Sequence, residues 1–226
     1  EIAPQCRART RRRVLNRVSK NTFILIGANA SSAALGFLIA IVIARAWGAP
    51  GLGEYSLVLA WTFTLGIVAE LGLNTLVTRE VAQNPARADN YLISSAIAKL
   101  ALALPLAGAF MLAAPILARD AETIAALRLG ALLIPLNALY GSFTALFRGL
   151  ERMTPIFILN TAGLITQLAG TVTLVANQWG VLAIIAWGVG VQVAQLAAAF
   201  FYLRRWGLLR GWVRGVHTER SECAHH

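Results

Sequence analysis

Six long apolar runs, separated by short polar segments, constrain the fold of this chain more than any other feature of its sequence. Each run is longer than the roughly 18 residues that identify a membrane-crossing helix. Hydrophobic residues make up 58% of the chain and charged residues only 13%, about half of the charge that a soluble domain carries. The sequence therefore predicts an all-α membrane protein with six transmembrane helices, over residues 21–47, 53–77, 91–117, 122–147, 155–177 and 181–203.

The distribution of basic residues predicts the orientation of these helices. Twenty Lys and Arg residues outnumber ten Asp and Glu residues, which gives a net charge of +10. With the N-terminus in the cytoplasm, the inner segments carry sixteen of the cations and the outer segments two or three. Because cytoplasmic segments of membrane proteins are enriched in Lys and Arg, both ends are expected inside. The same placement favours contact with anionic lipid over binding of nucleic acid.

The sequence divides into three parts. Residues 1–20 form a basic segment expected in the cytoplasm, residues 21–205 form the six-helix transmembrane lobe, and residues 206–226 form a basic cytoplasmic tail that we expect to be disordered. The run that begins at Asn21 is far longer than the roughly 7–15 residues of a signal-peptide core, so we expect it to remain as the first helix.

Four ionisable residues lie within the apolar runs or at their ends, and each marks a candidate site because an uncompensated charge is costly to insert in a bilayer. Lys99 lies eight residues into the third run, where it is expected either to face a cavity or to snorkel to the cytoplasmic headgroups. Glu70 lies at a comparable depth, and it either forms a structural ion pair with Lys99 or titrates during transport. Arg45 and Arg128 lie toward the outer side, where each either attracts a phosphate group or snorkels.

Polar and small side chains recur near helical spacing along three of the runs. Such stripes mark either close contacts between helices or the lining of a hydrated cleft, and the sequence leaves both open. The stripes comprise Asn29, Ser32 and Gly36; Asn160, Gln167 and Thr171; and Gly188, Gln192, Gln195 and Ala199. Pro105 and Pro135 lie in the middle of their runs, where proline kinks a helix or provides a pivot.

The sequence offers little support for catalysis. Cys6 and Cys223 lie in the terminal segments without metal ligands at usable spacing, which argues against a zinc site or a disulfide framework. No phosphate-binding glycine loop and no pair of nucleophile and base stands out. We therefore expect a protein that is not an enzyme and that has no metal and no cofactor; the identity of any coupling ion stays open.

Three stretches at the ends of the runs form recognisable motifs: Ala44–Tyr55, in which Ala49 separates Gly48 from Pro50; Gly72–Ala82; and Ala145–Met153. They are similar to loop motifs of the bacterial polysaccharide-biosynthesis and O-antigen flippase family, which belongs to the multidrug/oligosaccharidyl-lipid/polysaccharide exporter superfamily. The resemblance covers roughly residues 15–205. The inserted Ala49 departs from the family's turn, in which glycine and proline are adjacent.

The resemblance implies a multi-pass transporter of the cytoplasmic (inner) membrane that moves an undecorated or polyprenyl-diphosphate-linked glycan from the inner to the outer leaflet. It also implies alternating access between two six-helix lobes around a cationic cavity. This sequence contains one lobe, so the expected protein partner is a second six-helix lobe or a second copy. The other expected partners are membrane lipid and the lipid-linked glycan, and not nucleic acid.

The chemistry of such a cargo selects the candidate cavity residues. A diphosphate needs cations in a low-dielectric cleft, and its sugars need amides and hydroxyls. The candidates for the charged part are Arg45, Lys99 and Arg128, with Glu70 as an acidic neighbour. The candidates for hydrogen bonding are Asn29, Asn74, Asn160, Gln167 and Gln192.

Two other functions are compatible with the sequence. A drug or small-solute exporter of the same superfamily would favour acidic and aromatic cavity residues, whereas here the cations outnumber Glu70. A non-transporting membrane scaffold subunit would instead pair Lys99 structurally with Glu70 and close the polar stripes into helix contacts.

Overall fold

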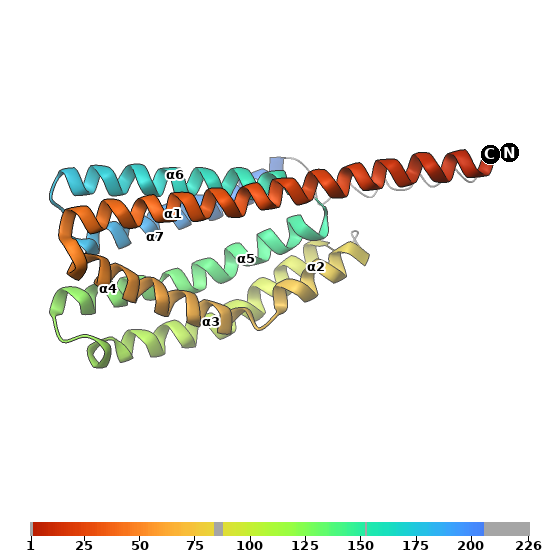
Figure 1. The fold of residues 1–226 in the computed structure, drawn as a ribbon. Coiled ribbons are helices and arrows are strands. Elements are labelled where there is room, and N and C mark those ends of the chain that lie inside the picture. The colour runs from red at the N-terminus through yellow and green to blue at the C-terminus, as the bar shows by residue number, and fades with distance from the viewer. Residues whose placement is uncertain (1, 84–87, 152, 206–226) are drawn as a thin grey trace.

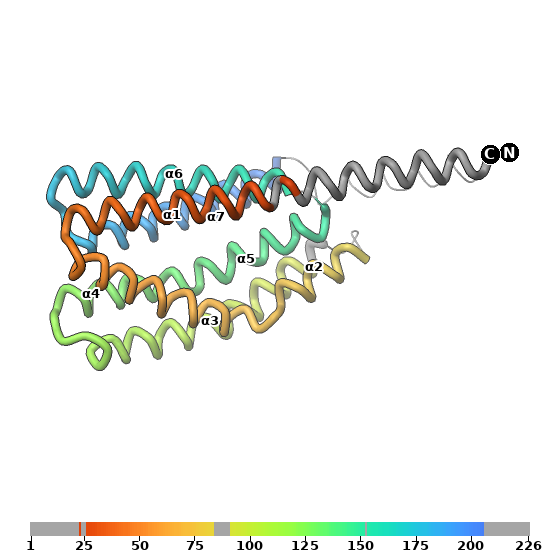
Figure 2. Tube along the Cα trace, viewed as in Figure 1, coloured from red at the N-terminus to blue at the C-terminus, as the bar shows by residue number. Residues whose placement is uncertain are grey.

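A bundle of antiparallel helices forms the structure, a computed structural model that describes residues 2–83, 88–151 and 153–205. The helices run back and forth along one axis (Figure 1), and the trace in Figure 2 shows the same order of passes. Within the described ranges there are seven α-helices and no strand: α1 (Ile2–Glu70), α2 (Leu73–Gln83), α3 (Ala88–Leu117), α4 (Ala121–Ala131), α5 (Leu133–Gly149), α6 (Thr154–Ala176) and α7 (Val181–Arg205).

Helix α1 contains two membrane spans that meet at Gly48. Its apolar part, Ile26–Glu70, has 45 residues, which as a straight helix would be roughly 68 Å long, more than twice the roughly 30 Å of a bilayer core. Gly48 has φ 67° and ψ −156°, a conformation that is essentially restricted to glycine. The chain reverses there, and the second half of α1 returns along the bundle (Figure 1). The predicted connection between the first two runs is thus a hairpin with almost no loop.

The remaining apolar helices each supply one span. They are Tyr91–Leu117, the α4–α5 segment Ala121–Gly149, Thr154–Ala176 and Val181–Arg205. Together with the two halves of α1, the described residues therefore provide six spans. The predicted all-α membrane fold is confirmed.

The second span ends earlier than the apolar run predicts. The run continues to Val77, but helix α1 ends at Glu70 because Leu71 and Gly72 adopt φ values of 39° and 73°. A residue in this left-handed region stops a helix, and glycine enters it without a steric penalty. The short amphipathic helix α2 follows, and it buries Val77 and Val81 against α5 and its neighbours.

Proline accounts for the break between α4 and α5. Pro135 has no backbone N–H, and its ring would clash with the carbonyl group four residues earlier, at Ala131. Helix α4 ends at Ala131 and α5 begins at Leu133. The predicted kink at Pro135 is present, whereas α3 continues through Pro105 as one helix.

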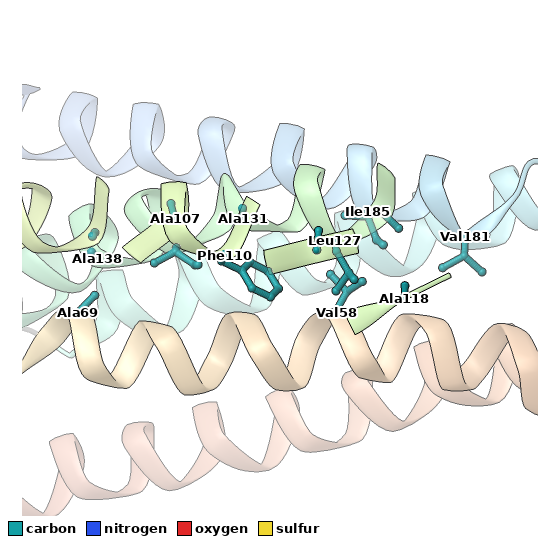
Figure 3. Packing of buried hydrophobic residues seen from close by; sticks show 14 residues of the cluster. Val58, Ala69, Ala107, Phe110, Ala118, Leu127, Ala131, Ala138, Val181 and Ile185 are labelled. Carbon is teal, nitrogen blue, oxygen red and sulfur yellow. The ribbon is translucent and has the colours of Figure 1, made fainter. Parts of the chain in front are cut away.

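Small residues let the spans approach closely in the core. Figure 3 shows Ala69, Ala107 and Ala138 among the buried residues that α1, α3 and α5 contribute to the largest apolar cluster. Phe110 belongs to the same cluster, and its ring centroid lies 6.1 Å from that of Trp61. Because a bilayer provides no hydrophobic drive for helix association, such close van der Waals packing holds a bundle together.

Large apolar side chains cover the outside of the bundle. Leu112 is 80% exposed and Ile116 is 87% exposed, and Phe37, Phe63 and Phe23 are also exposed. Exposure of this extent along helices of spanning length fits a surface that faces lipid tails.

Candidate functional site

A buried lysine organises the end of the bundle where α2 lies. Lys99 on α3 has 0% exposed surface. Its Nζ donates a hydrogen bond to Oδ1 of Asn74 on α2, and it interacts electrostatically with Glu70, the last residue of α1. A Cβ atom at Gly141 on α5 would lie 2.7 Å from Oε1 of Glu70 and 3.3 Å from Nδ2 of Asn74. We call Glu70, Asn74, Lys99 and Gly141 the Lys99 cluster.

The Lys99 cluster joins four helices and leaves no open space around the ammonium group. Two of its members, Glu70 and Lys99, are the residues that the sequence placed at a comparable depth. Oδ1 of Asn74 gives the ammonium group a hydrogen-bond acceptor, which a buried cation needs. The cluster is therefore suited to fastening α1, α2 and α3 to α5 at this end of the bundle.

A second polar feature lies at mid-depth and is hollow. A half-open cavity of about 420 Å³ is lined by both halves of α1 together with α5, α6 and α7. Its polar side chains are mainly amides and hydroxyls, and none of the described residues that line it is charged. We call it the amide pocket, after its polar lining residues Tyr55, Ser56, Asn137, Gln167, Gln192 and Gln195.

Two amides of the pocket have atoms without a protein partner. Gln167 donates through Nε2 to the carbonyl oxygen of Ile184 at 3.4 Å, which leaves its Oε1 buried and unpaired. The Nε2 atom of Gln192 is also buried and unpaired. Gln195, in contrast, donates to the carbonyl oxygen of Leu159 at 2.9 Å. Both atoms have almost no accessible surface, so the two side chains line the pocket while their unpaired atoms are turned away from its open space in this conformation.

Glycine creates the space for this lining. A Cβ atom at Gly163 would overlap the side-chain amide of Gln195, and one at Gly188 would lie 3.5 Å from Nε2 of Gln167. Gly36 faces the pocket from α1, and a Cβ atom there would have no neighbour within 4 Å. Gly188, which belongs to a predicted stripe, and Gly163, which does not, therefore make room for amides on the neighbouring helices.

The other predicted residues lie elsewhere. Asn160 on α6 accepts a hydrogen bond of 2.6 Å from the hydroxyl of Tyr140 on α5, and so links two helices. Arg45, Arg128 and Asn29 have exposed side chains and belong to neither the Lys99 cluster nor the amide pocket. The nine predicted residues are thus distributed over several places.

Sequence reasoning missed Tyr55, Ser56 and Asn137 as pocket residues. Asn137 carried a usable signal, because it is an amide within an apolar run and follows Pro135 by two positions. Tyr55 and Ser56 carried none, because hydroxyl side chains are common in membrane helices and only the return of α1 at Gly48 brings them to α6 and α7.

An open basin of about 1030 Å³ lies at the end of the bundle where α1 reverses, with Glu54, Asp120 and Glu122 in its lining. Asp120 caps α4: its carboxylate accepts hydrogen bonds from the hydroxyl and the backbone amide of Thr123, the latter at 3.1 Å. These bonds lower the pKa of Asp120, with the hydroxyl as the larger cause. No group of three or more His, Cys, Asp or Glu side chains in the described part of the chain could hold a metal ion.

Comparisons with known proteins identify the bundle. The family model described as "Polysaccharide biosynthesis protein" matches residues 18–220. The chain is 30% identical over 146 residues to "Stage V sporulation protein B" of Bacillus subtilis (strain 168), a match that covers 61% of this chain and 28% of that protein. The matched region is thus less than a third of the relative's length. No solved structure shows a significant match. Six membrane spans and a family match that covers all of them place this chain in the polysaccharide biosynthesis protein family.

Proposed function

We propose that this lobe helps to flip a polyprenyl-diphosphate-linked oligosaccharide across the cytoplasmic membrane for surface polysaccharide synthesis. The observation that carries the proposal is the amide pocket, a polar space at mid-depth in a membrane protein of the polysaccharide biosynthesis family. Sugars lose many hydrogen bonds to water on entering a bilayer, so a flippase must replace them with fixed polar groups.

Transport of this kind requires the polar part of the cargo to cross while its lipid tail stays in the membrane. In the proposed cycle, the lobe pairs with a second six-helix lobe or a second copy, and the pair alternates between inward-open and outward-open states. No covalent chemistry is needed, so the protein acts as a transporter and not as an enzyme. The exposed Arg45 and Arg128 are the proposed contacts for the diphosphate, because each retains a cation at the surface of the lobe.

The Lys99 cluster supports a second candidate function. Its closed, hydrogen-bonded arrangement is what a membrane scaffold subunit would use to hold its helices together. The uncharged lining of the amide pocket, on the other hand, disfavours an exporter of organic cations, which would need an acidic residue to compensate the charge of its cargo.

Transport is tested by reconstituting the protein in its full-length form in lipid vesicles that contain a polyprenyl-diphosphate-linked oligosaccharide. A glycosidase that cannot cross the membrane measures how much glycan reaches the opposite leaflet. We expect protein-dependent transfer, reduced at least tenfold by Gln167→Leu with Gln192→Leu and unchanged by Gln178→Leu in the α6–α7 connection. Absence of transfer by the folded, membrane-inserted protein would overturn the proposal in favour of the scaffold.

A further inference from the structure

The amide pocket has three properties that together restrict what can occupy it. It lies deep in the bilayer region, since Gly36, Leu59, Asn137, Gln167 and Gln192 each lie close to the middle of their own spans. It is of ligand size, because small-molecule sites occupy roughly 300–1,000 Å³ and this cavity measures about 420 Å³. It is also uncharged among the described residues that line it.

The absence of charge in that lining excludes the diphosphate from the pocket. An anion at this depth would need a cation or several donors to offset the loss of water, and the cost without them is several kcal/mol or more. Lys99 on α3 does not line the pocket, and it already donates to Asn74 at the end of the bundle where α2 begins. The occupant must therefore be neutral.

The amides and hydroxyls of the lining favour a polar occupant, and two of the amides have an unpaired atom. Oε1 of Gln167 lacks a donor and Nε2 of Gln192 lacks an acceptor. If both amide side chains turn toward the open space of the pocket, a hydroxyl group there satisfies both needs, because it donates one hydrogen bond and accepts two. An apolar chain would leave both amide atoms unsatisfied, at about 1–3 kcal/mol each.

The apolar part of the lining fits the rest of a sugar ring. Val58, Leu59, Ile184 and Ile185 line the pocket beside the ring of Tyr55. Pockets that hold small polar molecules combine such apolar walls with a few placed polar groups. A sugar presents hydroxyls at its rim and C–H groups on its faces, which matches this division.

We propose that the amide pocket binds one neutral sugar unit of the cargo, at a place separate from the groups that contact the diphosphate. Sugar and diphosphate are then recognised by different parts of the lobe. The inference rests on the proposed function for the source of the sugar, which arrives as part of a lipid-linked glycan. Free monosaccharide binding to the pocket does not require transport, and this allows the two to be tested apart.

Binding is measured by saturation-transfer-difference NMR on the full chain in lipid nanodiscs, with methyl glycosides of neutral hexoses and N-acetylhexosamines as probes. We expect at least one glycoside to bind with a millimolar Kd, and inorganic pyrophosphate not to compete with it. Competition by pyrophosphate would overturn the separation of the two recognition sites. Absence of binding by every glycoside would mean that the pocket holds water only, and would overturn the inference.

Two glycines of α1 provide a matched pair of variants. A Cβ atom added at Gly36 or at Gly27 would have no neighbour within 4 Å, but only Gly36 lines the pocket. Gly36→Leu is expected to reduce glycoside binding at least tenfold, whereas Gly27→Leu is expected to bind like the wild type. Equal binding by the two variants would place the sugar elsewhere and overturn the inference.

A second variant removes polarity without filling the pocket. Gln192→Leu deletes the unpaired donor, so we expect about tenfold weaker glycoside binding with no loss of thermal stability. Unchanged binding would contradict the role of Gln192. If glycosides bind as expected but the full-length protein moves no lipid-linked glycan, the pocket assignment stands and the proposed function fails. If Gly36→Leu no longer binds glycosides but still transports lipid-linked glycan, the proposed function stands and the role of the pocket in binding the cargo fails.

Discussion

At the scale of single residues, Lys99 shows how this chain tolerates a charge within a membrane-spanning helix. The side chain has no exposed surface, donates to Asn74 and lies near the carboxylate of Glu70. The sequence predicted the depth of Lys99 and Glu70 because position along a helix follows from residue number. It could not predict Asn74 as the partner, because that contact depends on where α2 folds back after Gly72.

We predict that Lys99→Met lowers the stability of the bundle by about 1–3 kcal/mol, because Asn74 loses its donor while remaining partly buried. Adding Asn74→Leu to this variant should recover part of the loss, since the unpaired amide is then gone. The measurement is equilibrium unfolding in mixed detergent micelles, with the exposed substitution Thr64→Val as a control. Equal stability of wild type and Lys99→Met would show that the hydrogen bond contributes nothing net.

The residues of the amide pocket show that the sequence does not reveal which side chains of a helix face the interior of the bundle. Gln167 and Gln192 were identified because amides are rare in apolar runs, and both line the pocket. Asn29 was selected on the same ground, and Arg45 and Arg128 for their charge, yet all three side chains are exposed. The direction in which a helix faces is set by its neighbours, and no stripe on a single helix encodes it.

At the scale of elements, breaks in helices follow backbone chemistry more closely than hydropathy. The sequence predicted a kink or pivot at Pro135, and α4 ends at Ala131, four residues before it, because the missing N–H and the ring act locally. The break at Leu71–Gly72 was not predicted, because the apolar run passes through it without a change in hydropathy. The resulting helix α2 is held by contacts with α5 that lie far away in the sequence.

Gly149 provides the test of that contact. A Cβ atom there would lie 2.8 Å from Cβ of Val81 and 3.0 Å from the backbone oxygen of Thr78. Because one of these contacts is with the backbone, helix α2 as a whole would have to shift to make room. We predict that Gly149→Ala destabilises the bundle by about 1–3 kcal/mol and speeds hydrogen exchange along α2.

The matched control is Gly108→Ala on α3, where a Cβ atom would have no neighbour within 4 Å. Because alanine favours a helix over glycine, this variant should be as stable as the wild type or slightly more stable. If hydrogen exchange along α2 is as slow in Gly149→Ala as in the wild type, the close approach to α5 does not hold this helix in place.

At the scale of the whole molecule, the orientation of the lobe stays a prediction of the charge distribution. The first span begins and α7 ends at the same end of the bundle (Figure 1), as an even number of spans requires. Arg204 and Arg205 in the last turn of α7 mark that end as the cytoplasmic one under the positive-inside rule. Helix α6 then begins inside and ends outside.

Single cysteines at the two ends of α6 test this orientation. In a background with Cys6→Ser and Cys223→Ser, we expect Gln178→Cys to react with a membrane-impermeant thiol reagent added to intact cells. Thr154→Cys should react only after the membrane is permeabilised, and both side chains are exposed in the structure. The reverse pattern of labelling would invert the lobe and move Arg45 and Arg128 to the cytoplasmic side.

The reversal at Gly48 also bears on how the protein is made. The second half of α1 is synthesised directly after the first. Almost no loop between the two halves has to be carried through the membrane. Two apolar helices that are joined this closely satisfy their backbone groups internally and can partition into the lipid together. We therefore expect the first two spans to insert co-translationally as a single helical hairpin. A side chain at position 48 would then act first on membrane integration of the nascent chain, before any effect on the folded protein.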